Sequence, residues 1–355
     1  MASNSVDQPL EFERSIKAIA DSSNLEAVPS KFNIANDYTA LPSDSIPLLD
    51  FSSLISADPH QRTKAVQDLA EASRVWGFFI LVNHGIPESL MKDAIAAVRD
   101  FFNLPESEKK QYESKSVLDS IQCGNLTLAN TSNQSFTFWR EYLRLRVHPD
   151  FHCPHHPQHL REIVMDYSKK IRELYMKIME AAVEYLELDK HYVDQLLKMD
   201  SMAQMVVGNC YPACPQPDKA IGLPPHTDPG LLTFLINNGV EGLQIEHDGK
   251  WFNVQSPPNS ILVNVDDHFE ILTNGRFKSL KHRAVVNKER ERISLVVLNT
   301  PAWDAIVGPA APLVDKDGSA LYHSMEYKQY LETSIAQSRL GGKSFFEQQL
   351  IIQDI

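Results

Sequence analysis

Apolar residues in the first half of the chain recur with the spacing of amphipathic helices. In Gln61–Val75 and again in Leu90–Phe101 they return every three or four positions, which places them on one helix face. The same spacing continues through Leu160–Leu186, enough for a helix of about 25 residues. Between the first two helices, the run Trp76–Val82 is almost continuously apolar and predicts a short buried strand.

The pattern changes after about residue 200. Short runs rich in β-branched and aromatic residues follow one another, separated by Pro, Gly, Asn and Asp and without helical spacing between them. Strands at such intervals predict an antiparallel sandwich or barrel. The predicted strands cover 202–211, 231–236, 242–246, 251–254, 261–265, 280–286 and 293–299. A helical pattern returns from residue 323 onward.

These patterns predict an α+β protein with four regions. Residues 1–45 are interrupted by prolines and form an N-terminal arm, and residues 46–200 form a mainly helical region. Residues 201–310 form the β core, and residues 311–355 form a C-terminal helical segment. Within the second region, Ser114–Ser135 is polar and without sustained period, so we expect a mobile loop that could act as a lid.

The composition narrows the classes of partner. The chain has 355 residues and a formal net charge of −12, which disfavours binding to nucleic acid or to an anionic membrane. No apolar run approaches the length of a membrane span, and acidic residues occupy the positions of a secretory signal. Four irregularly spaced cysteines suit free thiols in a reducing compartment. We therefore expect a cytoplasmic monomer that acts on a small molecule.

A candidate metal site appears in the β region. On an extended segment, His226 and Asp228 point to the same side, and His282 follows in a separate predicted strand. Two histidines and one carboxylate form the facial triad of non-haem Fe(II) oxygenases, which leaves coordination positions open. Zinc would favour a tetrahedral site, often with thiolates, and the cysteines offer no pair at zinc-finger spacing. Taken alone, the His-x-Asp pair is a weak signal and is more typical of an ordinary surface or hydrogen-bonding role.

Two further pairs suit a dicarboxylate ligand. Arg292 and Ser294 share one face of a predicted strand, where a forked guanidinium and a hydroxyl can bind a carboxylate. Asn209 and Tyr211 share a face of another strand and could hold the opposite end of such a ligand. Each pair also has a structural interpretation: Arg292 ends a charged run typical of a turn, and Tyr211 could be an ordinary core residue.

The order of several motifs resembles that of the plant 2-oxoglutarate/Fe(II)-dependent dioxygenases, which include flavonoid, gibberellin and alkaloid oxygenases. The resemblance covers roughly residues 40–345. The motifs that carry it are Ile46–Asp50, Trp76–Gly85, Asn209–Pro217, Leu223–Asp228, Gly242–Gln244, Ser279–Ala284 and Arg292–Ser294.

The resemblance implies a double-stranded β-helix, or jelly roll, flanked by helices. It implies that Fe(II) is the metal, with 2-oxoglutarate and O₂ as co-substrates and ascorbate as reductant. The reaction hydroxylates or desaturates a substrate while 2-oxoglutarate is converted to succinate and CO₂. The implied catalytic iron ligands are His226, Asp228 and His282; Arg292 and Ser294 correspond to the clamp on the distal carboxylate of 2-oxoglutarate, and Asn209 and Tyr211 to groups near its keto-acid end.

Two positions depart from the family pattern. The family often has Gly-Asp where Asp266-Asp267 stands, and we expect Asp266 to adopt a left-handed turn with modest strain. Cys210 replaces an aromatic residue in the Asn-x-Tyr motif and should point away from the substrate.

Substrate identity should depend on the cavity wall, for which core packing remains an equal alternative at each position. The candidates are largely apolar and favour a small hydrophobic metabolite, such as a phenolic, flavonoid, terpenoid or alkaloid. They are Phe138, Trp139, Tyr142, Met205, Val207, Leu298 and Thr300. Two other functions remain open on the same fold: an ascorbate-dependent oxidase, and a non-catalytic protein that binds a small ligand.

Overall fold

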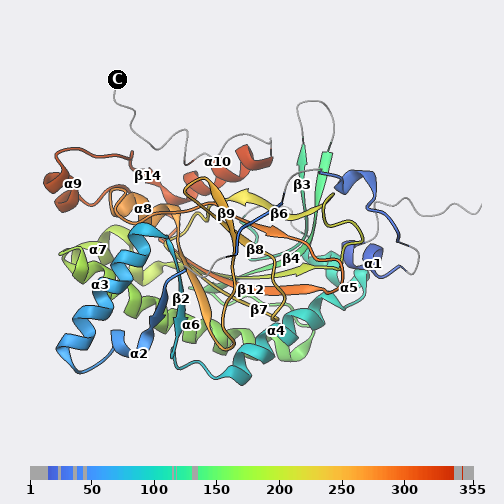
Figure 1. Cartoon of the computed structure of the whole chain (residues 1–355), viewed down its shortest axis with the longest axis horizontal. Helices are drawn as coiled ribbons and strands as arrows, with labels where there is room; N and C mark the ends of the chain where they lie inside the picture. Colours follow the sequence, from blue (N-terminus) through green and yellow to red (C-terminus); the bar gives the residue numbers. More distant parts are fainter. Residues whose placement is uncertain are drawn as a thin grey trace, which may run out of the picture.

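The computed structural model describes residues 15–22, 25–34, 38–42, 46–113, 116, 118–129, 135–339 and 346. In this part of the chain, two antiparallel-rich sheets form the centre of the molecule (Figure 1). The larger has eight strands in the order β1-β2-β10-β7-β12-β5-β4-β3, and the smaller has the order β6-β11-β8-β9. Helices surround the sheets, so the architecture is α+β as expected.

The strands of both sheets have the following bounds. The larger sheet contains β1 (Leu48–Asp50), β2 (Phe78–Val82), β3 (Ile121–Ala129), β4 (Ser135–His148), β5 (Ala203–Tyr211), β7 (Leu232–Asn237), β10 (Ile261–Val265) and β12 (Arg292–Thr300). The smaller contains β6 (Ile221–His226), β8 (Leu243–His247), β9 (Lys250–Asn253) and β11 (His282–Val285). A two-stranded pair, β13 (Ile306–Val307) and β14 (Met325–Glu326), lies apart.

The seven strands predicted after residue 200 all occur, with ends that differ by at most two residues from the prediction. Residues 46–200 were predicted to be mainly helical. They also contain four strands, β1, β2, β3 and β4, which all belong to the larger sheet. Strand β2 pairs with β10, so the buried run after the first long helix packs directly against the β core.

The loop predicted for Ser114–Ser135 is wrong over much of its length. Residues 121–129 form β3, which pairs with β4, for example Ile121 with Leu145 and Gly124 with Tyr142. As the last strand of the sheet, β3 pairs on one side only, and an edge strand tolerates polar side chains that hide its period. Residues 114–115, 117 and 130–134 of the predicted loop lie outside the described residues.

Long helices cover one face of the larger sheet (Figure 1). They are α3 (Pro59–Val75), α4 (Glu88–Phe102) and α6 (Gln158–Tyr185), all close to their predicted positions. Asp58 caps α3 by accepting a hydrogen bond from the backbone of His60, and Pro59 occupies the first turn, where no N–H is needed. The buried side chains of α6 recur every three or four residues, as its sequence pattern requires.

Shorter helices complete the structure. They are α1 (Ile16–Ala20), α2 (Phe51–Leu54), α5 (Glu106–Lys109), α7 (Lys190–Leu197), α8 (Asp267–Leu272), α9 (Ala311–Asp317) and α10 (Tyr327–Arg339). Helix α10 contacts β3 and lies over the side of the sheet opposite α4 and α6 (Figure 1).

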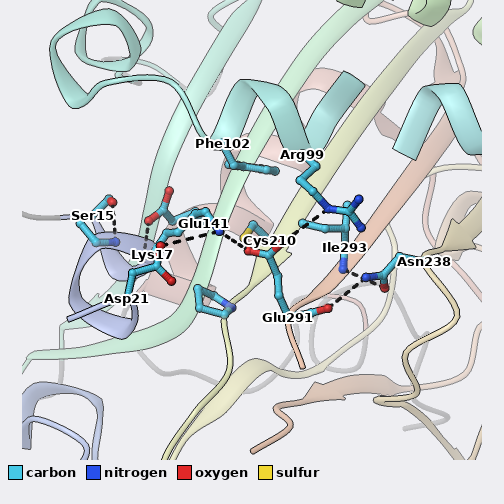
Figure 2. A network of polar contacts seen from close by, with 12 residues as sticks. Ser15, Lys17, Asp21, Arg99, Phe102, Glu141, Cys210, Asn238, Glu291 and Ile293 are labelled. Atoms are coloured by element: carbon cyan, nitrogen blue, oxygen red, sulfur yellow. Dashed lines mark hydrogen bonds and ion pairs between the residues drawn. The ribbon is translucent and has the colours of Figure 1, made fainter. Parts of the chain in front are cut away.

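A polar network attaches the described part of the N-terminal arm to the sheet (Figure 2). Lys17 Nζ of α1 forms an ion pair of 2.5 Å with Glu291, and its backbone N–H donates to Glu141 of β4. The Cys210 thiol also donates to Glu291, so Cys210 points away from the face that carries Asn209 and Tyr211, as expected. The arm therefore contacts β4 and the residue before β12, and Glu291 links it to β5 (Figure 2).

Candidate functional site

A cavity of about 320 Å³ lies between the two sheets. Alternate residues of β5 and β12 line it from the larger sheet, and the facing ends of β6 and β11 line it from the smaller one. Because successive side chains of a strand point to opposite faces, one face of each strand serves the cavity and the other serves the helix-covered core.

The predicted metal ligands converge at one wall of this cavity. His226 ends β6 and is the direct cross-strand partner of His282 at the start of β11. The nearest distances are 3.7 Å from His226 Nε2 to Asp228 Oδ1 and 3.7 Å from His282 Nε2 to Asp228 Oδ2. One ligand atom from each of the three residues lies within 4.8 Å of the other two. A single ion can therefore contact all three.

The protonation of these side chains suits a cation. His226 Nδ1 lies 2.8 Å from the carbonyl oxygen of Pro224, to which it donates, so that Nε2 keeps its lone pair. Burial and, to a smaller extent, the nearby His282 lower the pKa of His226 to about 4, so the imidazole is neutral at pH 7. Burial alone would raise the pKa of Asp228, but the two histidines and the amide of Asn264 lower it, so its carboxylate is charged.

A second layer of residues holds the Asp228 carboxylate. Asn264 Nδ2 donates to Asp228 at 3.0 Å and to Asp266 at 2.7 Å. Thr233 donates to the other oxygen of Asp266. The expected left-handed turn at Asp266 is wrong: its φ is −106°, and its backbone is extended before α8. The Asp in place of Gly therefore carries no backbone strain, and its side chain takes part in the network around Asp228.

The predicted dicarboxylate residues lie together at one end of the cavity. Arg292 and Tyr211 are cross-strand partners, and the guanidinium lies 5.2 Å from the centre of the Tyr211 ring. Asn209 Nδ2 donates to Ser294 Oγ at 3.2 Å. Arg292 is 2% exposed, yet among the described residues its Nε has no hydrogen-bond partner. A buried guanidinium donor without a partner is costly unless a ligand supplies the acceptor.

A glycine allows the Arg292 side chain to lie where it does. Gly242 has a φ of +150°, and a Cβ atom there would lie 3.0 Å from Arg292 Cδ and 2.8 Å from the carbonyl oxygen of Val285. Gly242 thus leaves room for the side chain of Arg292. Gln244, the third residue of the same motif, accepts a hydrogen bond from Arg283 at 2.6 Å.

The predicted wall residues divide into two groups. Tyr142, Val207 and Leu298 line the cavity, whereas Phe138, Trp139, Met205 and Thr300 lie outside its lining. Phe138 and Trp139 are both buried. Trp139 lies one residue from Arg140 and three from Tyr142, so alternation turns it to the opposite face of β4. Phe138 shares the parity of Tyr142, but the pairing of β4 with β3 shifts between Thr137 and Glu141. Trp139 Nε1 donates to the carbonyl oxygen of Pro212. Thr300 lies at the end of β12, where its hydroxyl donates to backbone carbonyls.

Arg140 and Arg144 are cavity residues that the sequence analysis missed. Both lie two residues from Tyr142, and residues two positions apart on a strand share a face, so alternation would have predicted them. Arg140 Nε donates to Asn209 Oδ1 at 2.8 Å, and Arg144 lies over the thioether of Met205. Arg144 thereby separates Met205 from the cavity. Other residues that line the cavity without having been predicted to do so are Phe78, Gln122, Leu126, Leu223, Leu235, Leu243, Val296 and Leu331.

Comparison with known proteins identifies the family. Residues 202–301 match the 2OG-Fe(II) oxygenase superfamily, and residues 46–165 match the family described as non-haem dioxygenase in morphine synthesis N-terminal. The 2-oxoglutarate-dependent dioxygenase 19 of Oryza sativa subsp. japonica is 41% identical over 300 residues, which are 84% of this chain and 88% of that protein. The chain belongs to the 2OG-Fe(II) oxygenase superfamily.

Further relatives agree with this assignment. Flavanone 3-dioxygenase 2 of Oryza sativa subsp. japonica is 36% identical over 290 residues, which cover 80% of this chain and 82% of that protein. Among solved structures, JOX2 in complex with 2OG, Fe and JA superposes with a TM-score of 0.83 and is 28% identical, covering 98% of this chain and 99% of JOX2. The expected jelly-roll fold and dioxygenase class are confirmed, and the two alternative functions are not favoured.

The residues present fit the iron and 2-oxoglutarate of this superfamily. Two imidazole nitrogens and one carboxylate are the donor set of non-haem Fe(II) sites, and the partnerless Nε of Arg292 suits a carboxylate ligand. Ascorbate is a general feature of the family as a reductant. In the described ranges, no helix combines the length and apolar character that crossing a bilayer requires.

Proposed function

We propose that this oxygenase hydroxylates or desaturates a small, largely apolar metabolite of the phenolic or flavonoid, terpenoid or alkaloid type. The residues proposed to hold the iron are His226, Asp228 and His282, and those proposed to hold 2-oxoglutarate are Arg292, Ser294, Asn209 and Tyr211. The observation that supports this assignment above all is the convergence of the two histidines and Asp228 in a cavity that also contains the buried guanidinium of Arg292.

Bound iron would supply activation of O₂, coupled to conversion of 2-oxoglutarate to succinate and CO₂. The protein's own contribution is positioning. The hydrogen bond from His226 Nδ1 to Pro224 keeps Nε2 available, and Asn264 orients the Asp228 carboxylate. The forked donors of Arg292 would bind the distal carboxylate of 2-oxoglutarate.

The proposed substrate lies against Tyr142, Val207 and Leu298, which line the cavity beside the triad. An apolar wall holds a hydrophobic skeleton and excludes water from the reaction. The relative named flavanone 3-dioxygenase 2 supports a substrate of this size and type.

We also propose a cytoplasmic monomer that binds neither nucleic acid nor membranes. The net charge of −12 repels both anionic surfaces, and the four cysteines are buried free thiols, as suits a reducing compartment.

The central test is spectroscopic. Anaerobic addition of Fe(II) and 2-oxoglutarate to the protein should produce a weak visible charge-transfer band, which His226→Ala and Asp228→Ala should abolish. Arg292→Gln should keep metal binding and weaken the affinity for 2-oxoglutarate. His247→Ala, a histidine outside the cavity lining, is the matched control and should retain the band. A protein that binds neither iron nor 2-oxoglutarate would contradict the proposal.

The substrate can then be sought directly. The enzyme is incubated with iron, 2-oxoglutarate and a plant metabolite extract, and mass spectrometry records compounds that gain one oxygen or lose two hydrogens. Products that depend on 2-oxoglutarate and disappear with His226→Ala would identify the substrate.

A further inference from the structure

The cavity contains more positive charge than iron and 2-oxoglutarate account for. Among its lining residues, Asp228 is the only carboxylate, whereas four arginines line it: Arg140, Arg144, Arg283 and Arg292. With the proposed ligands bound, the charges of Fe(II) and Arg292 balance those of Asp228 and the 2-oxoglutarate dianion. The guanidinium of Arg283 lies 4.0 Å from the centre of the Trp251 ring and donates to Gln244, both on the smaller sheet. The guanidinium groups of Arg140 and Arg144, on β4 of the larger sheet, are left without a compensating charge among the lining residues.

Neither of these two arginines has an acidic partner in the described part of the protein. Arg140 donates to the neutral amide of Asn209 and lies 5.3 Å from the centre of the Tyr142 ring. Arg144 directs Nε and Nη2 at Met205 Sδ, at 2.9 and 2.7 Å. A thioether is a weak acceptor, so this contact compensates little of the charge. Lys109 of α5, by contrast, is buried outside the cavity lining and pairs with Glu106 and Glu141.

Arg144 lies too far from Arg292 to bind the same end of 2-oxoglutarate. The guanidinium of Arg292 lies over Tyr211, and that of Arg144 lies over Met205. These two contact residues are six positions apart on β5, which is about 20 Å along the strand. Arg140, hydrogen-bonded to Asn209, is nearer the end proposed for 2-oxoglutarate. Arg144 therefore faces the remaining part of the cavity, where the organic substrate must bind.

We propose that the substrate carries a carboxylate on its apolar skeleton, and that Arg144 binds this carboxylate. The inference rests on the proposed function and narrows its substrate class. Apolar residues including Leu298 and Leu331 line the same cavity and suit the skeleton, and the forked donors of Arg144 suit a planar carboxylate. Binding would replace the weak contact with Met205 by a charge-assisted pair and orient the skeleton relative to the triad.

The test compares acids with neutral analogues of the same shape. Cinnamate, 1-naphthylacetate and 4-phenylbutyrate, each beside its primary amide, are titrated anaerobically into the full-length enzyme loaded with Fe(II) and 2-oxoglutarate. We expect at least one acid to bind tenfold or more tightly than its amide. Arg144→Gln should reduce this ratio toward one, and Arg144→Lys should restore part of it because the charge is kept.

Arg146→Gln is the matched control, since Arg146 lies two residues further along β4, donates to Ser120 and does not line the cavity. It should keep the preference for the acid. Several results would overturn the inference: amides that bind as well as acids, no binding by any acid, an unchanged ratio in Arg144→Gln, or a loss of 2-oxoglutarate affinity in that variant in place of the acid preference.

The unmodified enzyme separates this inference from the proposed function. If the charge-transfer band with Fe(II) and 2-oxoglutarate is absent, the proposed function fails. If the band is present and the acids show no preference, only the assignment of Arg144 fails.

Discussion

At the scale of single residues, Asn264 illustrates how the triad depends on a neighbour that is not itself a candidate ligand. Its amide lies between two buried carboxylates, those of Asp228 and Asp266, and donates to both. Burial and the nearby charge of Asp228 raise the pKa of Asp266 well above its ordinary value. The amide therefore orients the ligand carboxylate and limits the repulsion between the two acids.

Asn264→Ala should weaken metal binding, because outer partners of a ligand typically contribute about 10- to 100-fold in metal affinity. Titration with Fe(II) under anaerobic conditions measures the effect. Asn125→Ala, at an exposed position of β3, is the control and should bind metal normally. An unchanged affinity in Asn264→Ala would show that Asp228 is oriented without the amide.

His268 predicts a pH dependence of stability. The side chain is 1% exposed, Nδ1 donates to the carbonyl oxygen of Pro229, and burial lowers its pKa from 6.5 to about 4. The unfolded chain thus binds more protons than the folded protein between these two pH values. The free energy of unfolding should fall as the pH falls from 6.5 toward 4, by up to about 3 kcal/mol from this group.

His268→Asn keeps a donor for Pro229 and removes the titration, so its stability should fall less steeply over this pH range. Denaturant unfolding of both metal-free proteins at several pH values measures the difference in slope. Asp267 contributes with the opposite sign, because burial raises its pKa to about 7, but it is present in both proteins and largely cancels. Equal slopes would contradict the prediction.

At the scale of elements, one face of the larger sheet lines the cavity and its other face packs against the helices. Gly208 of β5 lies between Asn209 and Val207, on the face covered by α4. A Cβ atom there would lie 2.4 Å from Val98 Cγ1. The absence of a side chain is what lets α4 pack this closely, and the packing holds the strand that presents Asn209 and Tyr211.

Gly208→Ala should lower the free energy of unfolding by about 1–3 kcal/mol through overpacking. Val98→Ala removes the methyl groups in conflict, so the double variant should be less destabilised than the sum of the two single variants. Denaturant unfolding of the four proteins gives the coupling. Additive effects would mean that the conflict of the new methyl group is not with Val98.

At the scale of the whole molecule, the two sheets are linked through the site they enclose. The proposed iron ligands come from β6, β11 and the segment after β6, and the proposed 2-oxoglutarate residues come from β5 and β12. A ligand set that spans both sheets binds the folded protein and not the unfolded chain, so ligand binding should stabilise the entire fold.

Anaerobic Fe(II) and 2-oxoglutarate, each at about 100 times its dissociation constant, should raise the melting temperature by about 5 °C. A chelator should reverse the shift. His282→Ala should lose it, whereas Lys64→Met, which removes an exposed ion pair with Asp68, should keep it. An equal shift in His282→Ala would indicate that the metal binds elsewhere.

The sequence by itself determined most of the helices and strands, and it supplied the residues proposed for the site. The sequence contains three local patterns: helical spacing in 158–185, alternation through Arg292 and Ser294, and the His-x-Asp pair. Such patterns can be recognised because the helix and strand periods fix which nearby residues share a face. The order of motifs added the family. These features could be predicted without knowing which distant segments of the chain contact one another.

Only the tertiary structure decided which strands meet and which side chains reach the cavity. His226 opposes His282 because β6 and β11 pair, and β3 is a strand because β4 lies beside it. The shift in pairing between β3 and β4 falls at Phe138, which stays outside the cavity lining, and Arg144 covers Met205. Pairing and register are set by contacts between residues far apart in the chain, so no local pattern encodes them, and the charge of the substrate cavity became visible only after the strands were in place.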